Sequence, residues 1–227
     1  MMKRTAADNH KYHLLADTFC QDNRETQFLL NRMRAHDTYI YEHSLRAAYI
    51  SLLLAQGLGL PAEEQKLIYR SALLMDIGKL QTEDIKSAGN ETGASRRGGS
   101  KRSDMQHPIF SARLLESMAE AGQIDGEAIL HHHENLDGTG YPYGLVWEDI
   151  GLNARILRVA DSFTTMTSLH PRTGALEGID AALNELYCWS DIHYDSDLVA
   201  VVCQAYSVLE KKNRPREDKG FPQIVST

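Results

Sequence analysis

The residues of this sequence that could do chemistry are histidines and aspartates that stand beside apolar, helix-like segments. They are His43, Asp76, His107, His132, His133 and Asp161. Imidazole and carboxylate groups are ligands of divalent iron, manganese, zinc and nickel. A carboxylate in apolar surroundings is costly unless it is paired or binds a metal. Each residue also has an ordinary explanation as a core histidine, a surface histidine or a helix cap, so spacing alone leaves both interpretations open.

The segments that must position these residues have the periodicity of amphipathic helices. Helices are predicted at 41–56, 62–75, from Pro108 through Met118, and at 125–134, 153–168, 178–188 and 195–211, after one or two lead-in helices within residues 1–30. No alternating β pattern appears, so the predicted fold class is all-α. We divide the chain into an N-terminal helical lead-in (1–35), a main domain (36–212) and a C-terminal tail (213–227).

Net charge, the lack of long apolar stretches and the cysteines limit the partners and the compartment that we expect for this protein. The 227 residues carry a formal net charge of −7, which argues against binding to a nucleic-acid polymer or an anionic membrane. No signal-like N-terminus and no apolar stretch of about 18 residues is present, so we expect a cytoplasmic protein. Cys20, Cys188 and Cys203 form no paired framework. We interpret them as reduced thiols that pack as small buried hydrophobes.

One low-complexity stretch, residues 86–104, is rich in Gly, Ser, Arg and Lys. We expect a mobile surface loop there. Its basic residues are Arg96, Arg97, Lys101 and Arg102. They could form an electrostatic lid over an anionic ligand, or the loop could be a solvated linker.

The order of the motifs resembles that of a known family. The chain reads His43, then Asp76-Ile77-Gly78-Lys79, then His107-Pro108, then HHENLDGTGYP over 132–142, and finally ARILRVAD over 154–161. This series is similar to the HD-GYP family, a branch of the HD-domain metal-dependent phosphohydrolases, over roughly residues 37–210. The resemblance implies an HD-domain-like helical bundle, in agreement with the predicted all-α class.

The resemblance also implies a chemistry: hydrolysis of cyclic di-GMP, or a related nucleotide, at two divalent metal ions. Iron or manganese is expected, with zinc or nickel as alternatives. By resemblance, His43, Asp76 and Asp161 would hold one metal. Asp76 would bridge to a second metal, held also by His107 and His132, with His133 completing the cluster. Such a pair of metals can generate a hydroxide at neutral pH and neutralise a phosphodiester.

The same resemblance assigns roles at the substrate. Asp76 and Lys79 form the expected catalytic pair, with Lys79 placed over a phosphate as a point charge. The expected substrate-binding residues are Asp37, Lys79, Tyr141 and Arg172. Without the motif, a solvated surface lysine would be the simpler interpretation of Lys79.

The sequence departs from the family pattern at several positions. The first residue of the His-Asp pair is Met75, whose thioether is a poor ligand for iron, manganese or zinc beside carboxylates. We interpret Met75 as a core residue. Tyr39 stands where members with three metals carry a glutamate, so we expect two metals at most. Glu42 is a poor substitute for that glutamate, because it points away from His43 on an ideal helix. His36 is a weak candidate for a replacement ligand, and a surface histidine is the simpler interpretation.

The segment that usually reads RPYR in the family is His170-Pro171-Arg172-Thr173 here. Two hypotheses therefore stand. In the first, the chain is a cyclic-dinucleotide phosphodiesterase, because the other ligand positions are retained. In the second, it is a catalytically impaired module that acts as a nucleotide receptor or binds a signalling protein, because Met75 and the RPYR segment differ. A homodimer is compatible with either.

Overall fold

The structure is a computed structural model that describes residues 6–81, 105–168 and 178–213. Every regular element in these ranges is a helix, and the described residues contain only two isolated β-bridges, Asp137–Val146 and Ser190–Tyr194. The helices are α1 (Ala6–Cys20), α2 (Arg24–His36), α3 (Thr38–Gly57), α4 (Ala62–Leu74), α7 (His107–Leu114), α8 (Glu116–Glu120), α9 (Gly126–His131), α10 (Leu152–Met166), α11 (Ile179–Cys188) and α12 (Ser196–Asn213), with a 3₁₀ turn at Trp147–Asp149. The all-α prediction is confirmed.

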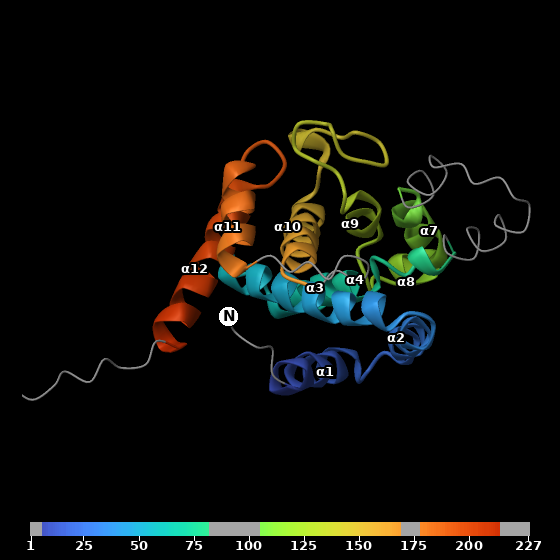
Figure 1. The fold of residues 1–227 in the computed structure, drawn as a ribbon. Helices are drawn as coiled ribbons and strands as arrows, with labels where there is room; N and C mark the ends of the chain where they lie inside the picture. Colours follow the sequence, from blue (N-terminus) through green and yellow to red (C-terminus); the bar gives the residue numbers. More distant parts are fainter. Residues whose placement is uncertain (1–5, 82–104, 169–177, 214–227) are drawn as a thin grey trace, which may run out of the picture.

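Helix α3 is the central element of the bundle. It packs against α4 and α10, and also against α1, α2 and α12. Figure 1 shows α1 and α2 on one side of the α3–α4 pair, and α9, α10 and α11 on the other. Small residues such as Ala47, Ala48 and Ala55 are fully buried along α3, which lets neighbouring helices approach its backbone closely. One helix thus joins the lead-in segment to the elements that carry the candidate ligands.

The core is continuous across the expected boundary at residue 35. Leu29, Leu30 and Met33 of α2 belong to the same buried cluster as the residues of α3 and α4. Asn23 caps the start of α2 by accepting a hydrogen bond from the backbone of Thr26 at 2.9 Å, as a short polar side chain at this position does. The position of the boundary remains a prediction.

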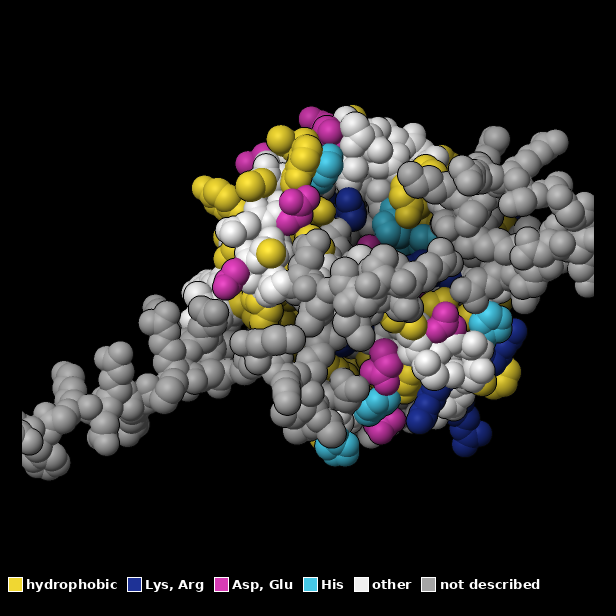
Figure 2. Space-filling view, viewed as in Figure 1, with side chains coloured by type: hydrophobic (Ala, Val, Ile, Leu, Met, Phe, Trp, Pro, Cys, Tyr) yellow, Lys and Arg dark blue, Asp and Glu magenta, His cyan; other side chains and the backbone are white. Residues whose placement is uncertain are grey.

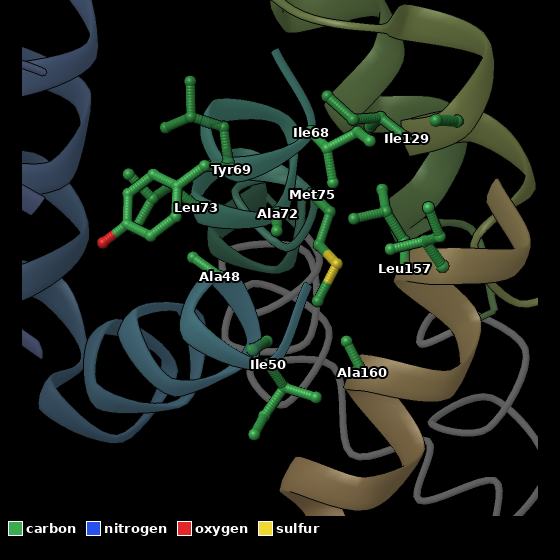
Figure 3. Close-up of a cluster of buried hydrophobic side chains, with 14 of the residues drawn as sticks. Ala48, Ile50, Ile68, Tyr69, Ala72, Leu73, Met75, Ile129, Leu157 and Ala160 are labelled. Carbon is green, nitrogen blue, oxygen red and sulfur yellow. The ribbon is translucent and has the colours of Figure 1, made fainter. Parts of the chain in front are cut away.

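Met75 lies inside this core, as predicted. Its side chain is fully buried, with no exposed surface. Figure 3 shows its sulfur among apolar side chains of α4, α9 and α10, including Ile68, Ile129, Leu157 and Ala160. The buried apolar face of α4 therefore continues past the end of the helix to Met75, directly before the buried carboxylate of Asp76.

Two predicted helices differ from the structure: one is divided in two, and the other ends earlier. The helix expected from Pro108 through Met118 is split at Leu115, which leaves the helical region with φ −103° and ψ 10°. The helix expected at 125–134 ends at His131. There His132 Nδ1 donates a hydrogen bond to the carbonyl oxygen of Ile129 at 2.6 Å. This side-chain hydrogen bond competes with the backbone hydrogen bond that would extend the helix.

None of the helices in the described part of the chain is long and apolar enough to span a bilayer. The cysteine prediction holds only in part. Cys20 is buried and Cys203 is partly buried, but Cys188 is exposed at the end of α11, so its interpretation as a buried hydrophobe is wrong.

This difference predicts selective alkylation. Burial raises the pKa of the Cys20 thiol to about 11, so little thiolate is present at pH 8. Iodoacetamide should label Cys188 of the native protein well before Cys20, measured by peptide mass spectrometry. In denaturant both should react at similar rates. Equal labelling of both in the native protein would contradict the packing of α1 against the core.

Candidate metal centre

Six predicted ligands come from five parts of the bundle. His43 lies on α3, Asp161 on α10, Asp76 just after α4, His107 at the start of α7, and His132 and His133 just after α9. All are buried except His133, which is partly exposed. Figure 2 shows histidine, acidic and basic side chains together in a hollow on the face seen in Figure 1. The fold thus gathers side chains that are up to 118 positions apart in the sequence.

These side chains form two groups that share Asp76. The acidic group consists of His43, Asp76 and Asp161, and the histidine-rich group consists of Asp76, His107, His132 and His133. Within each group the ligand atoms all lie within 4.8 Å of one another. Convergence of this kind is what a bound cation requires.

The Asp76 carboxylate divides its two oxygens between the groups. Oδ1 lies 3.1 Å from His107 Nε2 and 3.8 Å from His132 Nε2. Oδ2 lies 3.6 Å from His43 Nε2 and 2.7 Å from Lys79 Nζ. Although Oδ1 is close to His107, it makes no well-aligned hydrogen bond to a described residue, and it is buried. An acceptor in that state is costly unless a cation lies nearby.

Nitrogen atoms face one another in the histidine-rich group. His107 Nε2 lies 3.2 Å from both His132 Nε2 and His133 Nε2. His132 donates from Nδ1 to the carbonyl of Ile129, which leaves its Nε2 with a lone pair directed at the cluster. Such a hydrogen bond on the far side of the ring is typical of a metal-binding histidine.

The acidic group is joined to the other by a further contact. His43 Nε2 lies 2.9 Å from Asp161 Oδ1, and His133 Nδ1 lies 3.7 Å from Asp161 Oδ2. The Tyr141 ring stacks on His133, with centroids 4.6 Å apart and an angle of 22°. Tyr141 therefore lies at the edge of the cluster. Its expected role in substrate binding remains a prediction.

The protonation states suit metal binding. Burial lowers the pKa of His133 well below its usual value and also lowers that of His107, so both imidazoles are neutral at pH 7. Burial opposes ionisation of Asp76, but the Lys79 charge and the contacts from His107 and His132 outweigh it and hold its pKa well below 3.8. For Asp161, burial is likewise outweighed, by His43 and His133. Neutral imidazoles and ionised carboxylates are the ligand forms that metals bind.

Gly78 brings Asp76 against His107. A Cβ atom at Gly78 would lie 2.3 Å from the His107 carbonyl oxygen and 2.6 Å from the Ser111 backbone nitrogen. The Gly78 N–H donates to Ser111 Oγ at 2.9 Å. Only glycine allows the turn after α4 to meet the first turn of α7 this closely.

The role of a third buried carboxylate, Glu134, was missed by sequence reasoning. It is almost fully buried and accepts hydrogen bonds from the backbone N–H groups of Tyr143, at 2.7 Å, and Leu145, at 3.1 Å. Glu134 thus orders the loop that carries Tyr141 beside the cluster. The only sign of this role in the sequence is that Glu134 directly follows His132 and His133 and precedes the glycine-rich loop.

The other predicted positions fall outside the two groups. Asp37 is the N-cap of α3 and accepts hydrogen bonds from Tyr39 N at 2.6 Å and Ile40 N at 3.3 Å. His36 is exposed, and Glu42 pairs with His13 at 3.5 Å. Arg172 with the rest of 170–173, and the basic loop at 86–104, lie outside the described residues.

Fold and site together define a class of protein: an all-helical bundle with a buried cluster of histidines and aspartates arranged as two metal-binding groups. The chain belongs to the HD-domain family, whose model matches residues 26–198, and within that family it is of the HD-GYP type.

Several proteins named as phosphodiesterases are similar in sequence to this chain. A cyclic di-GMP phosphodiesterase of Pseudomonas aeruginosa is 31% identical over 185 residues, covering 79% of this chain and 42% of the relative. The response regulator RpfG of Xanthomonas campestris, named a cyclic di-GMP phosphodiesterase, is 34% identical over 173 residues, covering 73% and 43%. A 3'3'-cGAMP-specific phosphodiesterase of Vibrio cholerae is 28% identical over 199 residues, covering 83% and 44%. The chain therefore spans less than half the length of these relatives.

Solved structures agree on the fold. A chain described as an HDG"Y"P protein from Bdellovibrio bacteriovorus superposes with a TM-score of 0.60 at 17% identity, covering 88% of this chain and 64% of that one. A cyclic GMP-AMP phosphodiesterase from V. cholerae gives a TM-score of 0.56 at 21% identity, covering 79% and 46%.

The close approach at Gly78 predicts the effect of a single methyl group. Gly78→Ala should lower the free energy of unfolding by about 1–3 kcal/mol, because backbone atoms of α7 must move, and it should reduce bound metal by separating Asp76 from His107. Thermal or urea unfolding and elemental analysis measure the two effects.

Gly151→Ala is the matched control, because no described atom other than those of Gly151 and its two chain neighbours lies within 4 Å of its added Cβ. Its stability should change by less than about 1 kcal/mol and its metal content should not change. Equal behaviour of the two variants would contradict the proposed role of Gly78.

Proposed function

We propose that this chain is a metal-dependent phosphodiesterase that hydrolyses a cyclic dinucleotide, with cyclic di-GMP as the first candidate. The observation that carries the proposal is the pair of ligand groups sharing the buried Asp76 carboxylate. The names of the relatives supply the substrate class, since they include both cyclic di-GMP and 3'3'-cGAMP phosphodiesterases. Cyclic GMP-AMP is therefore the alternative substrate.

The residues fit two divalent ions. His43, Asp76 and Asp161 would hold one ion, and Asp76, His107, His132 and His133 the other. The buried Asp76 Oδ1, which makes no hydrogen bond to a described residue, and the orientation of His132 support this assignment. We propose iron or manganese, with zinc or nickel as alternatives, because nitrogen and oxygen donors suit these ions. When bound, such a pair activates water and neutralises the phosphodiester.

The chain's own groups would bind and orient the substrate. The Lys79 side chain is about one-third exposed, and its pKa is raised because the charges of Asp76 and Asp161 outweigh its burial. It therefore presents a positive charge between the buried Asp76 and the solvent, where a phosphate oxygen could be held. Tyr141, stacked on His133, would form one wall of the pocket. Asp37 and Arg172 remain proposed substrate contacts.

A second candidate is a receptor or interaction module with an impaired site. The burial of Met75 in the apolar core favours it, because the acidic group then has no protein ligand from that position. The two candidates differ in turnover and share nucleotide binding, so one set of measurements separates them.

The proposal predicts that metal content and turnover fall together. Asp76→Ala and His132→Ala should each lose bound metal and reduce cyclic di-GMP hydrolysis by about 100-fold or more, since metal ligands are removed. Metal is measured by elemental analysis, and hydrolysis by chromatography of pGpG and GMP with added Mn²⁺ or Fe²⁺ under reducing conditions.

His131→Ala is the matched control for His132→Ala. His131 is the neighbouring histidine, packs edge-on against Tyr143 and belongs to neither ligand group, so its metal content should match wild type. Unchanged metal in both ligand variants would refute the site. Bound nucleotide without turnover in the metal-loaded wild type would favour the receptor.

A further inference from the structure

The two ligand groups differ in number and kind of donor. The histidine-rich group offers three imidazole nitrogens and one carboxylate oxygen, whereas the acidic group offers one imidazole nitrogen and two carboxylate oxygens. More donors, and nitrogen donors in particular, favour tight binding of iron or zinc. Fewer donors rich in oxygen favour a harder ion such as Mn²⁺ or Mg²⁺, held with more water.

Met75 prevents the acidic group from gaining a fourth donor at its position. The thioether lies among Leu157, Ala160 and other apolar side chains (Figure 3), and Ala160 directly precedes Asp161. A soft thioether is also a poor ligand for a hard ion. The donor set of the acidic group is therefore the smaller one.

The Lys79 ammonium also opposes binding of a divalent ion in the acidic group. Its ammonium lies 2.7 Å from Asp76 Oδ2, the oxygen that faces His43 at 3.6 Å. Oδ1, which faces the histidine-rich group, has no such cation beside it among the described residues. A divalent ion in the acidic group must share its carboxylate oxygen with a positive charge, and like charges close together repel.

We propose that the two groups bind metal with unequal affinity. The histidine-rich group holds a resident ion, and the acidic group takes a second, hard divalent ion weakly and exchangeably. This inference rests on the proposed function. It implies that the concentration of the second ion sets the fraction of molecules able to hydrolyse substrate, so the site responds to metal supply.

Metal binding itself provides the test. Wild-type protein dialysed against a chelator of intermediate strength should retain about one ion per chain by elemental analysis. Titration with Mn²⁺, followed through the electron paramagnetic resonance of the free ion, should then reveal a second site with a dissociation constant at least about tenfold weaker.

Two pairs of variants address the two causes separately. Met75→His supplies a donor and should tighten the second site about tenfold, whereas Met75→Leu, which keeps the apolar packing, should leave it weak. Lys79→Gln removes the ammonium without adding a donor and should also tighten the second site, whereas Lys79→Arg should not. If Met75→His fails to fold, the comparison of Lys79→Gln with Lys79→Arg still tests the inference.

The results distinguish this inference from the proposed function. Two ions of equal affinity in the wild type, with turnover, would overturn the unequal binding and leave the enzyme proposal standing. A weak second site that neither Met75→His nor Lys79→Gln tightens would also overturn it. No metal binding at all would refute both.

Discussion

The structure depends on one fully buried carboxylate, that of Asp76. An ionised group without access to water is stable only when charges and hydrogen-bond donors surround it. Here Lys79, three residues away, supplies the neighbouring positive charge and donates to Oδ2. Histidines on α3, α7 and the segment after α9 lie around both oxygens. Each of these elements must therefore be held at a fixed position relative to the end of α4.

The packing around Asp76 follows from this requirement. The glycine at position 78 lets α7 approach until His107 reaches Asp76. The hydrogen bond from His132 to Ile129 stops α9 and turns its imidazole toward the same carboxylate. Glu134 then orders the following loop by accepting two backbone hydrogen bonds, which places Tyr141 against His133. Local features that would look unrelated along the sequence therefore serve one site.

The helices and the set of converging side chains were largely predictable, but the finer geometry was not. Apolar periodicity located α3, α4 and α10 within a few residues, because their buried faces are long and regular. The ends of α7 and α9 were wrong, because Leu115 leaves the helix within an apolar run and a side-chain hydrogen bond ends α9 at His131. The exposure of Cys188 depends on which face of α11 packs, and one residue in a short helix does not reveal that.

Site residues divide in the same way. The resemblance of the motif order to the HD-GYP family predicted which six side chains converge, whereas their types and spacing alone left the ordinary interpretations open. It did not predict that the Asp76 oxygens face different groups, because this depends on a side-chain rotation and on distances between helices. Glu134 escaped notice because its partners are backbone N–H groups nine and eleven residues away, which leave no mark on residue type. The expected roles of Asp37 and Arg172 remain predictions.

The neighbouring positions 75 and 76 indicate that the buried charged cluster is kept for function and not for packing. Met75 demonstrates that a long apolar side chain fits the core at the end of α4. Replacing a buried charged cluster with apolar residues of similar volume is often neutral or stabilising, so packing alone gives no reason for two buried aspartates and four histidines to stand together. The free-energy cost of burying these charged groups is explained if the cluster binds cations. Because the change at Met75 removes a donor from one group only, it alters the balance between the two groups while the shared carboxylate, and with it the arrangement of the helices, is preserved.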